Sequence, residues 1–109
     1  LEGKVAIVTG GAGYIGSTTA KRLASDGAVV VVCDANGRVG QTVAEAIVAD
    51  GGRAMAVETD VRSTASIGAM VEQVIEQHGH IDILVNAAGG SARERASTVY
   101  GSSEEVIGT

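Results

Sequence analysis

The chain has 109 residues, a formal net charge of −5 and no basic run. This length allows at most one domain, and the acidic balance argues against nucleic-acid binding and against docking to an anionic membrane. No apolar segment approaches the ~18 residues that a membrane span needs. The one cysteine excludes an intramolecular disulfide, so we expect a cytoplasmic protein.

The first predicted strand is the apolar run at residues 5–9, and a glycine-rich turn follows it. The turn has the spacing Gly10-x-x-Gly13-x-x-Gly16. The first glycine permits a sharp turn out of the strand, the second lets a pyrophosphate approach the main chain, and the third lets a helix pack close to the strand. This order of strand, glycines and helix is typical of a dinucleotide-binding βαβ unit.

The helix predicted after this turn covers residues 14–26, and it repeats Ile15, Thr19 and Leu23 every four residues. The free N–H groups of its first turn suit phosphate groups. A second strand at residues 29–33 is apolar on both faces, as expected of a strand buried between two helix layers. Asp34 follows that strand, 18 residues after Gly16, where dinucleotide-binding units place an acid for the ribose.

The remaining elements alternate in the same way. A helix is predicted at residues 37–50, a strand near the sheet edge at 54–59, a helix at 64–78 and a fourth apolar strand at 81–85. The predicted core faces of the two helices are Val39, Val43, Ala46 and Ile47, followed by Ile67, Met70, Val71, Val74 and Ile75.

This alternation predicts an α/β fold, a doubly wound parallel sheet of the Rossmann type in three αβα layers with strand order 3-2-1-4. The glycine turn, Asp34, Asp60 and the Asn86-Ala87-Ala88-Gly89 segment each follow the carboxyl end of a predicted strand. Ligands bind at that edge of open α/β sheets. We therefore expect these four features to form one binding rim.

The chain resembles the short-chain dehydrogenase/reductase family over essentially its whole length. Thr9 to Gly16 resembles the family's cofactor turn, Asp60-Val61 its adenine-contacting pair, and residues 82–89 its fourth-strand signature. The last motif is the most specific, because generic dinucleotide-binding domains lack it. The glycine spacing is that of the family's extended branch, whereas the branch called classical has glycine in place of Tyr14. The fourth-strand motif and the helix lengths favour the classical branch.

The resemblance implies a set of cofactor-binding residues: Gly10, Gly13, Tyr14, Ile15, Gly16, Asp34, Asp60, Val61, Asn86, Ala88 and Gly89. Within this set Asp34 would accept hydrogen bonds from the adenosine ribose, and Asp60 would border the adenine. Each residue also has a purely structural interpretation. Asp34 would then be a solvated acid at a strand end, Asp60 would open a turn before a helix, and Asn86 would brace the sheet with its amide. Tyr14 is expected to act through its backbone.

The cofactor preference follows from charge. A 2′-phosphate ~4 Å from the Asp34 carboxylate would cost on the order of 4 kcal/mol at an effective dielectric constant near 20, up to roughly a thousandfold in affinity. The glycine turn contains no Lys or Arg, and Arg38 lies a full helical turn beyond Asp34. We therefore predict NAD⁺/NADH in preference to NADP.

By resemblance the complete protein is an NAD-dependent oxidoreductase that transfers hydride between nicotinamide and a small alcohol or carbonyl substrate, as a homodimer or homotetramer. The family's general acid/base is a Tyr with a Lys four residues later, and positions 18 and 104, four after each tyrosine, hold Thr and Glu. We expect no metal site, no catalytic residue and no activity in residues 1–109 alone. They are expected to form a single NAD-binding domain that is incomplete at its C-terminus.

Residues 90–109 are predicted to be a loop followed by the start of a helix near Ser102 or Ser103. Two other functions stay open from the sequence. An S-adenosylmethionine-binding methyltransferase also has a glycine turn and an acid after its second strand, although the three-glycine spacing and the Asn86 to Gly89 motif fit it poorly. The other is a non-enzymatic domain that senses a dinucleotide.

Overall fold

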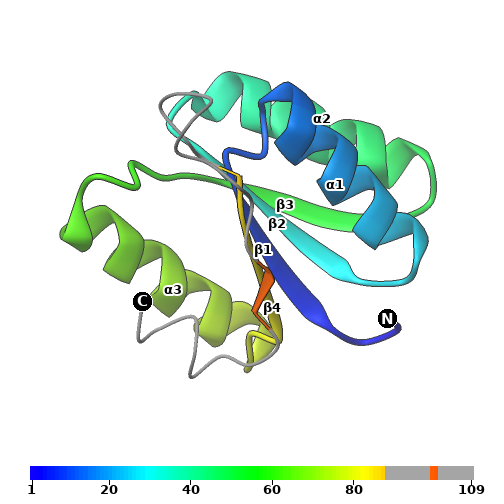
Figure 1. Cartoon of the computed structure of the whole chain (residues 1–109). Helices are drawn as coiled ribbons and strands as arrows, with labels where there is room; N and C mark the ends of the chain where they lie inside the picture. The colour runs from blue at the N-terminus through cyan, green and yellow to red at the C-terminus, as the bar shows by residue number, and fades with distance from the viewer. Residues whose placement is uncertain (88–98, 101–109) are drawn as a thin grey trace.

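The computed structural model describes residues 1–87 and 99–100, which form one sheet between two layers of helices (Figure 1). The elements in chain order are β1 Val5–Thr9, α1 Tyr14–Ser25, β2 Val29–Asp34, α2 Gly37–Ala49, β3 Arg53–Glu58, α3 Thr64–His78, β4 Ile83–Asn86 and β5 Val99–Tyr100. The strand order is β3-β2-β1-β4-β5. This confirms the predicted doubly wound α/β fold and its order 3-2-1-4.

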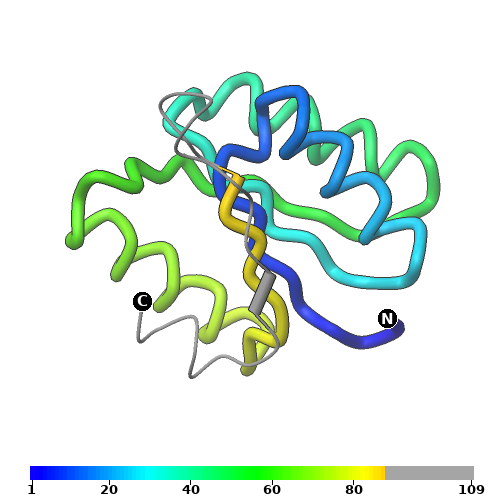
Figure 2. Tube along the Cα trace, viewed as in Figure 1, coloured from blue at the N-terminus to red at the C-terminus, as the bar shows by residue number. Residues whose placement is uncertain are grey.

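Strand β1 lies between β2 and β4, and both pairings are parallel. Figure 2 shows the chain leaving β3 at one side of the sheet, passing through α3 and returning as β4 beside β1. All five residues of β1 are buried, and so are the central four of β2, whereas β3 is only half-buried. A strand covered by helices on both faces must be apolar on both, and an edge strand need not be. The predicted edge position of the third strand is confirmed.

Helices α1 and α2 cover one face of the sheet, and α3 covers the other (Figure 1). Alternate residues of each strand therefore enter two different cores. Ala6, Val8, Val30 and Val32 pack in the core under α1 and α2. The residues between them, such as Ile7 and Val31, pack in the core under α3.

The buried residues of α1 are Gly16, Ala20 and Ala24, which differ from the repeat of Ile15, Thr19 and Leu23 that indicated the helix. The small residues let the helix axis come close to the sheet, so Ile15 is left 62% exposed, while Leu23 packs partly buried against the core. Apolar size alone does not mark this face, because the close approach depends on side chains that are nearly absent.

The other two helices keep only part of their predicted faces. In α2, Val43 and Ile47 are buried as expected, but Val39 is 38% exposed and Gly40 takes its place against the sheet. The buried residues of α3 are Met70 and Val74. The outer members of the predicted α3 stripe, Ile67 and Ile75, stay 37% and 40% exposed.

Strand β4 begins at Ile83, two residues later than the predicted start at position 81. The reason is the Asp82 side chain. Its Oδ2 accepts the Val5 N–H at 2.9 Å, and its own N–H donates to Val5 O at 2.9 Å. A side-chain bond thus replaces the first main-chain bond of the ladder, although Ile81 is still buried in the core.

The prediction of a loop after residue 90 is wrong at Val99–Tyr100, which pairs antiparallel with Leu84 and Val85 as β5. The predicted helix start near Ser102 and Ser103 lies outside the described residues. Within residues 1–87 and 99–100, each helix is too short or too polar to cross a bilayer.

Candidate functional site

The carboxyl ends of β1 to β4 meet at one edge of the sheet, which we call the rim. It comprises residues 10–13, the glycine loop, together with Asp34, residues 58–62 and residues 86–87. The Gly11 N–H donates to Cys33 O at 3.0 Å, and the Ala87 N–H donates to Thr9 O at 3.1 Å. These bonds tie the loops together across neighbouring strands.

Two glycines of the motif are required by the protein itself. Gly10 has φ +68°, in the left-handed region that favours glycine. A Cβ on Gly16 would lie 2.0 Å from the Gly10 carbonyl oxygen, so α1 can begin here only without that side chain. A third glycine, Gly11, was not predicted from the motif, and its Cβ would lie 2.7 Å from Val32 Cγ1.

Gly13 is different, because nothing inside the described residues requires it to be glycine. Its φ is −76°, which any residue can adopt. A Cβ on Gly13 would have one neighbour within 4 Å, the Gly10 carbonyl oxygen at 3.4 Å. The residue is exposed at the rim. Its missing side chain therefore leaves open space in front of the start of α1.

Helix α1 begins without a side-chain cap, since its N-cap is Gly13. Helices α2 and α3 are capped by the side chains of Asn36 and Ser63. Among the described residues, the N–H groups of Tyr14 and Ile15 have no hydrogen-bond acceptor, and the first turn of α1 contains no acid. Such free N–H groups, together with the helix dipole, form a binding place for an anion.

Asp34 lies directly beside the glycine loop, at the end of β2. Its Oδ2 accepts the Ala12 N–H at 3.0 Å, and its Oδ1 accepts the Asn36 N–H at 2.9 Å. The carboxylate is half-buried. An ionised carboxylate accepts about four hydrogen bonds, so each oxygen retains a lone pair for another donor. The predicted neighbours, the glycine loop and Asp34, are therefore in contact.

Asn86 lies at the end of β4 and is held by Thr9 at the end of β1. The Thr9 hydroxyl lies 2.9 Å from Asn86 Oδ1 and is 3.4 Å from Val85 O. Thr9 is 7% exposed, whereas Asn86 is exposed at the rim. The Asn86 amide oxygen thus braces the end of β4 against the end of β1. The predicted residues Ala88 and Gly89 lie outside the described part of the chain.

Asp60 opens the turn that leads into α3. Its Oδ1 accepts the N–H and the Nε–H of Arg62, at 2.9 Å and 3.2 Å, and its own N–H donates to Ser66 Oγ at 2.9 Å. The Arg62 N–H and then its guanidinium hold the pKa of Asp60 below its usual value. Val61, next to it, is 40% exposed. The turn places an apolar side chain at the rim beside an ionised carboxylate.

Cys33 lies under this rim and is fully buried in the core below α3. Burial is the main cause that raises the pKa of the Cys33 thiol to about 12. A hydrogen bond with Thr59 lowers this pKa by a smaller amount, and the charge of Asp34 raises it further. The thiol is therefore protonated and inert at neutral pH.

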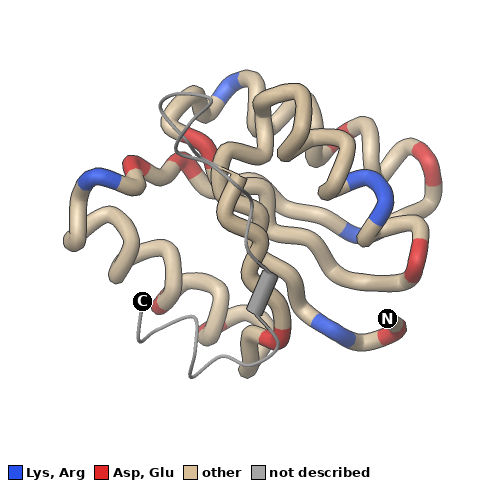
Figure 3. Tube along the Cα trace, viewed as in Figure 1, with Lys and Arg blue, Asp and Glu red and all other residues tan. Residues whose placement is uncertain are grey.

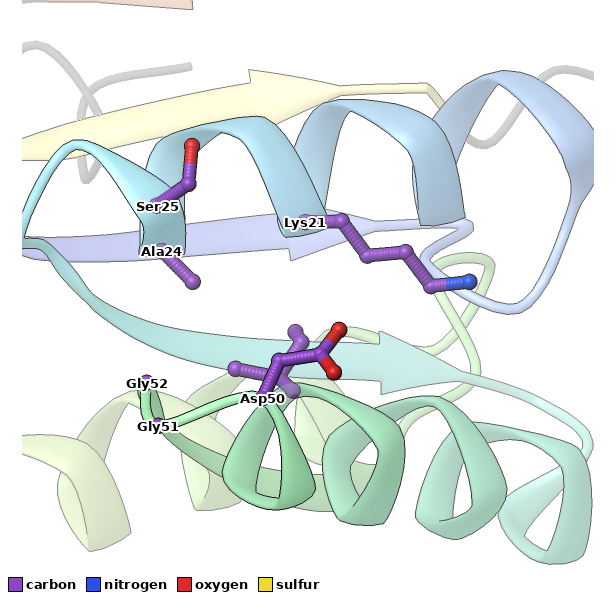
Figure 4. Close-up of a pocket in the computed structure, with 7 residues that line it drawn as sticks. Lys21, Ala24, Ser25, Asp50, Gly51 and Gly52 are labelled. Atoms are coloured by element: carbon purple, nitrogen blue, oxygen red, sulfur yellow. The ribbon is translucent and has the colours of Figure 1, made fainter.

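Charge at the rim is mostly acidic, as Figure 3 shows where β2 and β3 end. Asp34 pairs in register with Glu58 on β3, and Asp60 follows two residues later. Arg62 contacts this group through Asp60, and no other ion pair to these carboxylates occurs within the described residues. A cavity of about 270 Å³ lies elsewhere, between the C-terminal ends of α1 and α2, where the side chains of Lys21 and Asp50 extend into the space between the two helices (Figure 4). That end of the helices is opposite the rim.

Comparison with known proteins identifies the family of this chain. A family model described as short chain dehydrogenase matches residues 4–106. The chain belongs to the short-chain dehydrogenase family. The match confirms the resemblance drawn from the glycine turn, Asp60-Val61 and the fourth-strand motif.

Relatives within this family are substantially longer. An uncharacterized oxidoreductase of Methylorubrum extorquens is 49% identical over 90 residues, which are 82% of this chain and 36% of that protein. The chain spans 33% to 41% of the length of the curated relatives it matches.

Two solved structures of the family contain different cofactors. A putative D-mannonate oxidoreductase of Haemophilus influenza with bound NAD is 37% identical, with a TM-score of 0.80, and the match covers 84% of this chain and 32% of that one. A metagenomic short-chain oxidoreductase in complex with NADP is 39% identical, with a TM-score of 0.79, covering 82% and 40%. Both cofactors thus occur among close structural neighbours.

Proposed function

We propose that the rim binds a nicotinamide dinucleotide and that the complete protein is an oxidoreductase using it. The observation that carries this proposal is the exposed start of α1. Within the described residues nothing requires Gly13 to lack a side chain, and the N–H groups of Tyr14 and Ile15 find no acceptor there. A diphosphate that approaches Gly13 closely would explain both features.

The other predicted residues fit the remaining parts of the ligand. The free lone pairs of Asp34 suit the hydroxyl groups of the adenosine ribose, and Val61 and Asp60 suit the apolar face and polar edge of adenine. We assign Asn86, with Ala88 and Gly89, to the path toward the nicotinamide. Gly10 and Gly16 contribute by shaping the turn. Residues 1–109 then form a single cofactor-binding domain.

We propose NAD(H) rather than NADP(H) as the preferred cofactor. Asp34 is half-buried and ionised groups flank it at Glu58 and Asp60, so a 2′-phosphate at the ribose would meet like charge. The cation nearest in sequence, Arg38, is exposed on α2. The structural neighbours with NAD and with NADP support a nicotinamide cofactor without distinguishing the two.

The proposed reaction is hydride transfer between the cofactor and an alcohol or carbonyl group of a small molecule. Its support is the family and the oxidoreductase and dehydrogenase names of the relatives. Bound nicotinamide supplies or accepts the hydride, and the rim would hold and orient it. Neither tyrosine of the chain has the Lys four residues later that the family's acid/base pair needs. We therefore propose that residues 1–109 supply cofactor binding, within a cytoplasmic homo-oligomer.

Gly13→Ala tests this proposal in the full-length protein. The change removes the open space in front of α1, and a Cβ there meets nothing closer than 3.4 Å. The loss of stability should stay within about 1 kcal/mol, since alanine is a poorer N-cap than glycine. Binding of NADH, followed by its fluorescence enhancement, should weaken by about tenfold or more. Unchanged NADH affinity in this variant would contradict the diphosphate assignment.

The same titration separates the alternative functions. A methyltransferase would retain S-adenosylmethionine and ignore NADH. A sensing domain would bind NADH with no alcohol or ketone turned over by the full-length protein. The proposed enzyme binds NADH, ignores S-adenosylmethionine and shows a change in absorbance of the nicotinamide when supplied with a substrate.

A further inference from the structure

Asp34 makes two hydrogen bonds within the protein before any ligand is present. Its Oδ2 accepts the Ala12 N–H at 3.0 Å, and its Oδ1 accepts the Asn36 N–H at 2.9 Å. One carboxylate therefore joins the glycine loop after β1 to the turn that starts α2. Ala12 in the glycine loop and Asp34 at the end of β2 are 22 residues apart along the chain.

The bond to Ala12 differs from the other bonds of the glycine loop. Gly11 and Gly13 donate to main-chain carbonyls, of Cys33 and Gly10, at 3.0 Å each. Within the described residues, the acceptor of the Ala12 N–H is the Asp34 side chain and no main-chain carbonyl. The group is partly buried, and a buried N–H without an acceptor is costly. The orientation of the Ala12 peptide therefore depends on the identity of residue 34.

We propose that Asp34 is a positioning residue for the glycine loop, in addition to its assigned contact with the ribose. This inference rests on the proposed function only for its effect on cofactor binding. The carboxylate holds the loop in the shape that presents Gly13 and the N–H groups of Tyr14 and Ile15 outward. Removing it to admit a 2′-phosphate would release the loop that has to bind the diphosphate. Truncation at position 34 would then weaken NADH binding, and NADPH would gain less affinity than relief of the like charge alone would give.

Glu58 offers a matched control for the charge of Asp34. The two residues pair in register on neighbouring strands. The Glu58 side chain packs over the start of α2, where its Oε1 lies 2.6 Å from the position of a Cβ on Gly37. It makes no hydrogen bond to the glycine loop within the described residues. Glu58→Gln therefore removes one negative charge from the same edge and leaves the loop bonds in place.

The experiment measures hydrogen exchange of the glycine-loop amides in the full-length protein without cofactor, for wild type, Asp34→Asn, Asp34→Ala and Glu58→Gln. The Ala12 amide should be protected in wild type. Loss of a hydrogen bond to a charged acceptor should speed its exchange by about tenfold or more in Asp34→Ala. Asp34→Asn keeps one acceptor oxygen for two N–H donors, so its Ala12 amide should exchange at a rate between those of wild type and Asp34→Ala. Glu58→Gln should leave the exchange rate unchanged.

Titration with NADH and NADPH of the same four proteins tests the consequence. Asp34→Ala should lose about tenfold or more in NADH affinity, with partial rescue in Asp34→Asn, and it should bind NADPH at least about tenfold more weakly than wild type binds NADH. An Asp34→Ala variant that binds NADPH as tightly as wild type binds NADH would overturn the positioning role. So would an Ala12 amide that exchanges at the unprotected rate in wild type, which needs no variant to fold. Wild type that binds neither cofactor would refute the proposed function, while the exchange rates still decide the positioning role.

Discussion

The contact between α1 and the glycine loop gives a sharp prediction at Gly16. In the variant Gly16→Ala, the added Cβ would lie 2.0 Å from the Gly10 carbonyl oxygen, 2.7 Å from Gly10 C and 3.0 Å from Gly11 Cα. All three atoms belong to the main chain, so no side chain can rotate away. The first turn of α1 would have to move off the loop by about 1 Å or more to reach ordinary contact distances.

The size of the effect follows from two opposing contributions. Overpacking of this kind costs typically about 1–3 kcal/mol, and alanine inside a helix recovers about 0.5–1 kcal/mol relative to glycine. The net change should be a loss of about 1–2 kcal/mol in the free energy of unfolding. NADH affinity should fall as well, because the shifted turn carries the N–H groups assigned to the diphosphate.

Gly68→Ala is the matched control, since it also replaces a glycine inside a helix. Within residues 1–87 and 99–100, a Cβ on Gly68 has no neighbour within 4 Å, and the residue is exposed on α3. This variant should gain about 0.5–1 kcal/mol and bind NADH as wild type does. Urea unfolding of the full-length proteins measures both changes. If Gly16→Ala were as stable as Gly68→Ala, the close contact between α1 and the loop would be refuted.

Three further changes test other parts of the structure. The Cys33 thiol has a pKa of about 12 in the folded protein against 9.0 ordinarily. Unfolding between these two pH values therefore releases the thiol proton, so the free energy of unfolding should fall as pH rises through this range, by up to about 1.4 kcal/mol per pH unit. The free energy of unfolding of Cys33→Ala should depend less steeply on pH than that of wild type. Equal slopes for the two proteins would contradict the buried thiol. Asp82→Ala leaves the Val5 N–H without its acceptor and should lower unfolding free energy by about 1–3 kcal/mol, with Asp82→Asn losing less; equal losses would argue against the bond. Thr9→Val should lose about 1 kcal/mol, and in a double-mutant cycle with Asn86→Ala the losses should be less than additive; full additivity would show that the two side chains do not interact.

The arrangement of the sheet could be predicted from the sequence because it follows from few, strong patterns. Fully apolar runs at β1 and β2 require cover on both faces, and the handedness of parallel connections then fixes the strand order. The glycine spacing and the acid at position 34 predicted neighbours that are in contact in the structure. These features depend on residue type and spacing alone.

Other details depend on packing in three dimensions, and the sequence did not reveal them. The buried face of α1 is made of Gly16, Ala20 and Ala24, which a search for large apolar side chains passes over. The start of β4 is set by the Asp82 side chain at Val5, a bond between residues 77 positions apart. The bond from Ala12 to Asp34 required the fold to be known first, because any residue at position 12 other than proline supplies the same N–H.

The structure of the full-length protein with NAD is the most direct test of the central claim, that the rim is a dinucleotide site. The diphosphate should lie against Gly13 and accept hydrogen bonds from the N–H groups of Tyr14 and Ile15, and the adenosine ribose should donate to Asp34. A cofactor bound away from the start of α1, or a ribose that makes no contact with Asp34, would contradict the account.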